Sequence, residues 1–306
     1  MLRSLLFQFS SAHFLRLAGS CLVLAFAIAS STHAQTETVL HDFVPEPFGA
    51  NPYAQLIADA SGNLYGTTAS GGVYNNGVVF ELIHDPNGRW SQKVLYTFSG
   101  LPEVNQLSRL LLDSAGNLYG TIASTQTSCG LVYRLSRSVG GNWMYTSIYS
   151  FSCTFGSTDG QFPSSGLTMD KAGNLYGVTA DGGAYDNGSF EGGTVYELSP
   201  SANGTWSEQI LYNFGSQDPG GYGPSAELVL DSSGDIFGVT TGGGDNNCGT
   251  GLGSKSIPTG CGAVFELTQS NGASSESVLY TFTTPAGYGN WQYFGPITGL
   301  CPLASK

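Results

Sequence analysis

The stretch Asp59-Ala-Ser-Gly-Asn-Leu-Tyr-Gly-Thr-Thr68 decides the fold, because the chain repeats it three more times. Two further phrases follow every copy in the same order, one of the type GVVFEL and one of the type WSQKVLYTF. Successive copies start 54, 57 and 61 residues apart, at Asp59, Asp113, Asp170 and Asp231. Three interleaved phrases at this spacing predict a tandem-repeat protein.

Each repeat predicts four short strands, A to D, of which A ends at the aspartate, as in Ala54 to Ala58. The phrases NLYGTT, VVFEL and KVLYTF supply B, C and D. Asp-x-x-Gly-Asn favours a tight A–B turn, and Asn-Gly or Gly-Asn favours a C–D hairpin. Because C and D are partly apolar on both sides, both faces of each sheet need cover. Radial stacking into a β-propeller provides this, and a linear stacked array is the alternative.

The predicted units do not fill a whole number of repeats. A lone D-type strand, Thr38 to Phe43, precedes the first unit, and a lone A-type start, Phe294 to Cys301, follows the fourth. We therefore expect an all-β, propeller-like domain with four full four-stranded blades and a partial fifth. The expected units are approximately 51–98, 105–151, 162–214, 223–282 and the partial 294–306.

The first 34 residues have the pattern of a signal peptide. Arg3 and Arg16 precede an apolar run from Cys21 to Ala29, and Thr32-His-Ala34 suits cleavage after Ala34. Residues 35–306 then form a single repeat domain without a second apolar stretch long enough to span a membrane. This predicts export to the extracellular space or cell surface, with the periplasm as a further possibility.

Charge excludes one class of partner. The formal net charge is −12, from 10 basic and 22 acidic residues. Nucleic-acid binding needs clustered Lys and Arg to neutralise phosphates, so we expect no nucleic-acid partner. No motif indicates a cofactor.

The phrases GNLYGTT, GG-x-Y-x-N-G and G-x-VFEL resemble the GloVer tandem repeat of bacterial exported proteins that carry a choice of C-terminal anchors. The resemblance covers residues 38 to about 301. It implies a bacterial exported protein with a propeller-like fold. It supplies no established activity and no catalytic residues.

Catalytic and metal sites are not predicted. Outside the signal peptide only His41 and His84 occur, at unrelated positions of the repeat, which disfavours a histidine-based metal site or triad. The repeated aspartates are interpreted as turn formers, and Asp-x-x-Gly-Asn alone offers too few oxygens for calcium. The alternative is a carbohydrate-active enzyme using carboxylates of the variable loops, namely Asp181, Asp186, Glu191, Asp218 and Asp245.

The cysteines predict disulfides in an oxidising compartment. Cys129 precedes strand C and Cys153 follows strand D of the second unit, so the hairpin brings them opposite each other. Cys248 and Cys261 bracket the long B–C insertion of the fourth unit and form the second expected pair, leaving Cys301 over.

The B–C and D–A connections vary in length, and a propeller places both on one side. That side is expected to display aromatic and polar side chains suited to sugars. The leading hypothesis is a binding module for an extracellular glycan or protein, and the alternatives are a structural surface array or the carbohydrate-active enzyme. The candidate ligand-binding residues are Tyr74, Asn75, Asn76, Phe155, Asp159, Tyr185, Asp186, Asn187, Tyr222, Asp245 and Asn246.

Overall fold

The computed structural model describes residues 37–99, 108–124, 128–154, 157–185, 192–215, 218–244, 260–270 and 273–283. The predicted signal peptide and the predicted partial unit at 294–306 lie outside these residues. The chain forms two compact units, Met1–Leu40 and His41–Lys306. All the sheets belong to the second unit.

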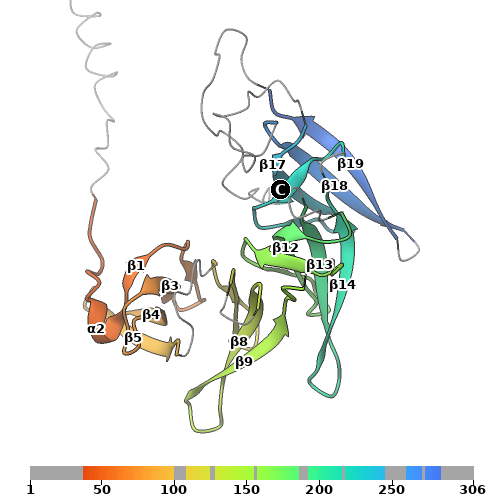
Figure 1. The fold of residues 1–306 in the computed structure, drawn as a ribbon. Coiled ribbons are helices and arrows are strands. Elements are labelled where there is room, and N and C mark those ends of the chain that lie inside the picture. The colour runs from red at the N-terminus through yellow and green to blue at the C-terminus, as the bar shows by residue number, and fades with distance from the viewer. Residues whose placement is uncertain are drawn as a thin grey trace, which may run out of the picture. The chain divides into compact units, whose positions relative to one another are not determined.

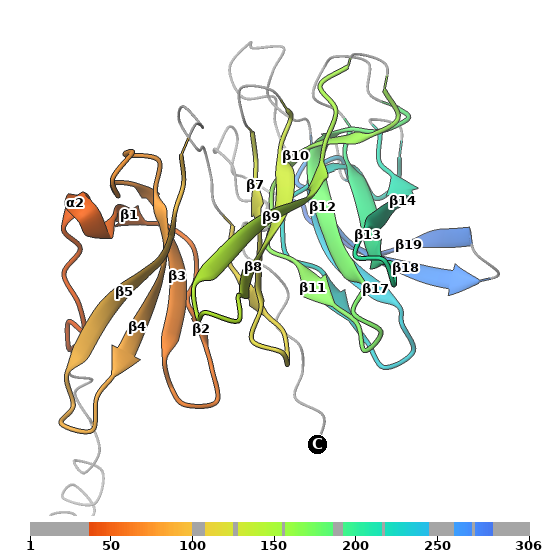
Figure 2. The same cartoon turned by 90° about the horizontal axis from the view of Figure 1, so that it is seen from below.

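Four antiparallel sheets make up the described part of this unit, one for each repeat (Figures 1 and 2). A four-residue helix, α2 (Pro45–Phe48), precedes them. The first sheet contains β1 (Ala50–Pro52), β2 (Ile57–Ala58), β3 (Leu64–Ser70), β4 (Val78–His84) and β5 (Trp90–Thr97). The second contains β6 (Leu111–Leu112), β7 (Leu118–Ile122), β8 (Leu131–Arg137) and β9 (Trp143–Ser150).

The third sheet contains β10 (Gly160–Pro163), β11 (Thr168–Met169), β12 (Leu175–Gly182), β13 (Thr194–Pro200) and β14 (Trp206–Asn213). The fourth contains β15 (Tyr222–Pro224), β16 (Val229–Leu230), β17 (Ile236–Gly242), β18 (Ala263–Ser270) and β19 (Ala273–Thr281). In each sheet the strands of the B, C and D phrases are neighbours in chain order. The predicted all-β, propeller-like fold is confirmed.

The first strand of the repeat differs from the prediction. The prediction of a continuous strand from Ala54 to Ala58 is wrong, because β1 and β2 are separate strands on the same edge of β3. Pro52 lies opposite Thr68 and Ile57 lies opposite Tyr65. Proline has no N–H with which to continue the ladder, so the strand breaks there. The third and fourth sheets, β10–β11 and β15–β16, break in the same way.

The A–B turn confirms the interpretation of the repeated aspartate as a turn former. Asp59 Oδ1 accepts hydrogen bonds from the backbone N–H of Ser61 at 2.8 Å and of Asn63 at 2.9 Å. Its Oδ2 accepts from Asn63 Nδ2 at 3.0 Å and from the Tyr65 hydroxyl at 3.1 Å. Asp113 and Asp170 repeat all four bonds, with their carboxylates fully engaged in the turn.

A bulge in every C–D pair explains why these strands are apolar on both sides. In the first sheet Val79 lies opposite Tyr96 but Phe80 lies opposite Val94, so Leu95 is the extra residue. Leu95 and Phe98 would face opposite sides of a regular strand, since they are three residues apart. The bulge brings both into the cluster between the first and second sheets. The other three sheets shift register at the corresponding position.

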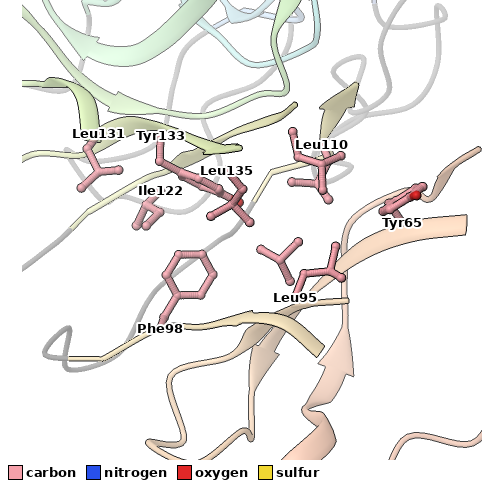
Figure 3. Packing of buried hydrophobic residues seen from close by; sticks show 10 residues of the cluster. Tyr65, Leu95, Phe98, Leu110, Ile122, Leu131, Tyr133 and Leu135 are labelled. Carbon is pink, nitrogen blue, oxygen red and sulfur yellow. The ribbon is translucent and has the colours of Figure 1, made fainter. Parts of the chain in front are cut away.

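Neighbouring sheets pack through aromatic residues at the end of strand D (Figure 3). The Phe98 ring lies 5.5 Å from the Tyr133 ring of the second sheet, edge to face. At the next two seams Phe151 meets Tyr196 edge to face, and Phe214 meets Phe265 with the two rings tilted. Phe98, Phe151 and Phe214 are at most 1% exposed.

The predicted D-type strand from Thr38 to Phe43 is not formed as a strand. No described strand offers it a hydrogen-bonded ladder, which a strand requires. The side chains of its last residues still pack against the first sheet, as the end of a D strand packs against the next sheet elsewhere. Phe43 packs edge-on against Phe80 at 5.0 Å, and His41 Nε2 lies 2.7 Å from Gln92 Oε1.

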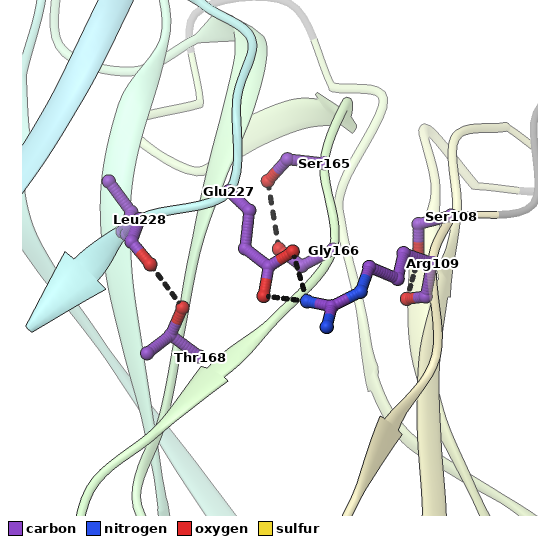
Figure 4. A network of polar contacts seen from close by, with 7 residues as sticks. All are labelled: Ser108, Arg109, Ser165, Gly166, Thr168, Glu227 and Leu228. Atoms are coloured by element: carbon purple, nitrogen blue, oxygen red, sulfur yellow. Dashed lines mark hydrogen bonds and ion pairs between the residues drawn. The ribbon is translucent and has the colours of Figure 1, made fainter. Parts of the chain in front are cut away.

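An ion pair links the first strands of the second and fourth repeats (Figure 4). Arg109 Nη1 donates to both carboxylate oxygens of Glu227, at 2.6 and 2.7 Å. Gly166 of the third repeat lies beneath this contact, and a Cβ there would come within 3.2 Å of Glu227 Oε2. Glycine at this position therefore leaves room for the arginine to reach across one whole repeat.

Candidate functional site

The B–C and D–A connections meet on one side of the sheets, as the antiparallel strand order requires. Two backbone hydrogen bonds between successive repeats show this contact directly. Phe162 N–H, in β10, donates to the Cys129 carbonyl at 2.7 Å, and Gly223 N–H, in β15, donates to the Gly192 carbonyl at 2.8 Å. We call this side the loop face; it is formed by residues 71–77, 128–130, 151–154, 157–159, 183–185, 192–193 and 218–221.

Two tyrosines stand exposed on the loop face at equivalent positions. Tyr74 is 60% exposed and Tyr185 is 64% exposed. Each follows a pair of glycines with positive φ, which are Gly71 and Gly72 in the first case. Glycine adopts this backbone conformation without steric cost, and the chain turns sharply before the tyrosine.

Local hydrogen bonds hold both tyrosine loops. In the first, the Asn75 side-chain oxygen accepts from Gly71 N–H at 3.0 Å, and Asn75 itself has a left-handed φ of 56°. In the third repeat, Ala184 N–H donates to Asn213 Oδ1 at 2.8 Å. Two of the predicted residues, Tyr74 and Tyr185, are thus presented to solvent from braced loops, while Asn75 serves the loop itself.

Several other predicted site residues have different surroundings. The prediction that Tyr222 lies on the surface is wrong. Its side chain is 2% exposed, within the cluster between the third and fourth sheets. Asn76 is half-buried beside Gly77. Phe155, Asp186, Asn187, Asp245 and Asn246 lie outside the described residues.

The predicted disulfide between Cys129 and Cys153 is confirmed, with the two Cα atoms 5.1 Å apart. It fastens the B–C loop of the second repeat to the segment that follows strand D. Cys261 is also disulfide-bonded. Its expected partner Cys248 lies outside the described residues, as does Cys301, so that pairing stays a prediction.

Asp159, another predicted site residue, belongs to a half-buried polar group between the second and third sheets. Its carboxylate accepts from the Tyr149 hydroxyl at 3.2 Å and from Ser152 N–H at 2.8 Å. Glu208, on β14 of the next sheet, approaches the same tyrosine and aspartate. Burial raises the pKa of Glu208 to about 7, and the charge of Asp159 adds to the rise. Burial also raises the pKa of Asp159.

The next seam repeats this arrangement. The Tyr212 hydroxyl lies 2.6 Å from Asp218 Oδ2 and 3.5 Å from Glu276 Oε2. Burial, with a contribution from the Asp218 charge, raises the pKa of Glu276 to about 7. The remaining oxygens, Glu208 Oε1 and Glu276 Oε1, are buried without a hydrogen-bond partner. Each of these two seams therefore holds a glutamic acid with a raised pKa beside an aspartate.

One position of the repeat indicates these two acidic groups in the sequence. The third residue of the D phrase is Gln92, Tyr145, Glu208 or Glu276, whereas the tyrosine four residues later is constant. At the first seam Tyr145 stacks on Tyr96 at 5.0 Å, in place of an acid. An acid at an inward-facing position was therefore the clue, but its partner aspartate comes from a loop of variable length.

The described residues hold neither a grouped set of metal ligands nor a membrane-spanning helix. Within the described ranges no three or more His, Cys, Asp or Glu side chains are grouped as metal ligands. No helix in that part of the chain has the length and apolar character needed to cross a bilayer.

Several solved structures resemble this chain at low identity. A gluconolactonase from Xanthomonas campestris is 14% identical, with 74% of this chain and 62% of that chain covered and a TM-score of 0.43. PorZ, a surface component of the type-IX secretion system of Porphyromonas gingivalis, is 13% identical over 83% of this chain and 30% of its own, with a TM-score of 0.44. An α-L-arabinanase from Cellvibrio cellulosa is 9% identical over 73% and 75%, with a TM-score of 0.35.

The chain spans less than two thirds of the gluconolactonases it matches, and these distant likenesses carry no activity over to it. No curated protein matches the sequence significantly. The family comparison is more decisive. The model of the Gloeobacter/Verrucomicrobia repeat matches residues 24–252 and 109–295, which together span most of the sequence and all four described sheets. The chain therefore belongs to the Gloeobacter/Verrucomicrobia repeat family.

Proposed function

We propose that this protein is exported and binds an extracellular glycan or protein through its loop face. The observation that carries the proposal is the pair of exposed tyrosines, Tyr74 and Tyr185, at the same position of two repeats. An exposed aromatic ring on a braced loop loses little conformational entropy on binding and offers an apolar surface to a sugar ring. Repetition of the ring suits a ligand that is itself repetitive.

Further features support export. The first 34 residues have the pattern of a signal peptide, and the Cys129–Cys153 disulfide suits an oxidising compartment. The acidic surface, with its formal net charge of −12, favours neutral sugars or basic protein patches over anionic partners.

The test is a glycan and surface-protein binding screen with the protein expressed from its full sequence. Replacing both tyrosines in Tyr74→Ala plus Tyr185→Ala should weaken binding about 30-fold, since each stacked ring contributes about 1 kcal/mol. Tyr53→Ala is the matched control, because Tyr53 is 79% exposed but lies between β1 and β2 and is not part of the loop face. Equal effects of the control and the double variant would refute the proposal, and a screen without binding would favour a structural surface array.

One observation favours a second candidate function, a carbohydrate-active enzyme. Glu276, with a pKa of about 7, lies beside Asp218, and a protonated acid next to a carboxylate is the pairing that acid-catalysed glycoside hydrolysis needs. Hydrolysis of a polysaccharide panel, lost in Glu276→Gln and retained in Glu37→Gln, would establish this function. Absence of turnover on the panel would exclude it in favour of binding.

A further inference from the structure

One face of the fourth sheet is exposed, whereas the equivalent faces of the other sheets are covered. Leu279 is 51% exposed, whereas the equivalent Leu95 and Leu211 are each 8% exposed. Tyr280 is 58% exposed, and Phe282 is half-buried although its counterparts are almost fully buried. Val264 is likewise half-buried, in contrast to the fully buried Val79, Val132 and Val195. This face, formed by Phe237, Val264, Leu279, Tyr280 and Phe282, is called the open face.

At the second and third seams the first strand of the following repeat helps to cover the equivalent face, both times through the same contacts. The residue before the proline donates its N–H to a carbonyl of the preceding repeat, as Phe162 does to Cys129 and Gly223 to Gly192. The proline then lies against the next glycine of that repeat. A Cβ on Gly193 would stand 2.5 Å from Pro224 Cδ, so only glycine admits the proline.

Two further features complete this docking pattern. The residue before the proline has a left-handed φ, which is 57° in Asn51, 57° in Phe162 and 63° in Gly223. A leucine four residues after the proline is buried at the seam, and Leu167 and Leu228 are 1% and 2% exposed. The pattern therefore needs a residue tolerant of positive φ, a proline and a leucine at fixed spacing.

One segment outside the described residues has this pattern. Phe294-Gly-Pro-Ile-Thr-Gly-Leu300 matches Tyr222-Gly-Pro-Ser-Ala-Glu-Leu228 in register, with glycine at the position of positive φ. On the fourth sheet, Cys261 and Gly262 occupy the positions of Gly192 and Gly193. Gly262 also has a positive φ, of 81°.

We propose that residues Phe294–Leu300 dock on the open face as the first strand of a fifth unit. In this register Gly295 corresponds to Gly223, Pro296 to Pro224 and Leu300 to Leu228, and the docking positions on the fourth sheet are Cys261 and Gly262. A second copy of the chain is a poorer occupant. The complementary face, on the first sheet, already holds Phe43 against Phe80 and His41 beside Gln92.

The experiment measures acetylation of Tyr280 by N-acetylimidazole in the full-length protein, read by peptide mass spectrometry. Leu300→Asp should make Tyr280 react about tenfold faster, because a lost leucine contact shifts the docking equilibrium by at least that factor. Leu303→Asp, three residues further on and outside the pattern, is the matched control and should leave the rate unchanged. Gly295→Val, which opposes a positive φ, is a second variant and should act like Leu300→Asp.

Equal rates in the wild type and both docking variants would overturn the proposal. So would protection of Tyr280 that disappears on dilution together with a dimer in analytical ultracentrifugation, because a second copy would then be the occupant. Acetylation of Tyr53, which is 79% exposed and remote from the open face, serves as the internal reference for folding.

Discussion

Replacing Glu276 by glutamine should stabilise the protein at alkaline pH and leave it unchanged in acid. The native carboxyl has a pKa of about 7, against an ordinary value of 4.5. Between these values the native state holds a proton that the unfolded chain has released. Stability therefore falls as the pH rises from about 4.5 to about 7, and the loss is complete above pH 7. Glutamine keeps the shape and does not titrate.

The magnitude follows from the size of the pKa change. At 1.36 kcal/mol per unit the cost above pH 7 is about 3 kcal/mol as an upper bound. Glu276 is only half-buried, and solvent screening reduces the cost to about 1 to 2 kcal/mol. For a domain of this size that corresponds to a Tm increase of about 3 to 6 °C at pH 8.5. Glu208→Gln should behave alike at its own seam, since its pKa is also about 7.

The assay is thermal unfolding by circular dichroism at pH 4.5, 6, 7 and 8.5. Glu37→Gln is the control, because Glu37 is exposed. The difference in Tm between Glu276→Gln and the wild type should be near zero at pH 4.5 and grow through neutral pH. A difference that is constant with pH, or one that the control reproduces, would refute the reasoning.

Three further predictions concern stability measured by urea denaturation. Cys129→Ser plus Cys153→Ser should lower the free energy of unfolding by about 3 kcal/mol, as reduction of the wild type should, and an unchanged midpoint would show that the disulfide does not constrain the unfolded chain. Phe98→Ala should cost about 3 to 5 kcal/mol, because the ring is 1% exposed between two sheets, whereas a cost below about 1 kcal/mol would mean that the seam collapses around the gap. Arg109→Met and Glu227→Gln should show a coupling of about 1 kcal/mol in a double-mutant cycle, and strict additivity would mean that the ion pair contributes nothing.

Features that depend on neighbouring residues could be predicted from the amino-acid sequence. Asp59 accepts hydrogen bonds from residues at most six positions away, so its role could be predicted from one turn. The Cys129–Cys153 disulfide closes across a single hairpin, whose turn lies midway between the two cysteines. Exposure of Tyr74 and Tyr185 follows from the glycine pair before each. These properties are local, because each depends on residues within one turn, hairpin or loop.

The contacts across the seams between sheets could not be predicted from the sequence and are known from the folded chain. Glu208 lies 49 positions from Asp159, in another repeat, and their meeting depends on the packing of sheets rather than on any local pattern. Tyr222 was expected on a loop but is the first residue of β15 and is buried in the cluster between the third and fourth sheets. Arg109 meets Glu227 of the fourth repeat across the third, beside Gly166, where a Cβ would come within 3.2 Å of Glu227 Oε2. Contacts of this kind are set by the bulges, strand breaks and loop paths that orient each sheet against the next, and no single repeat contains them.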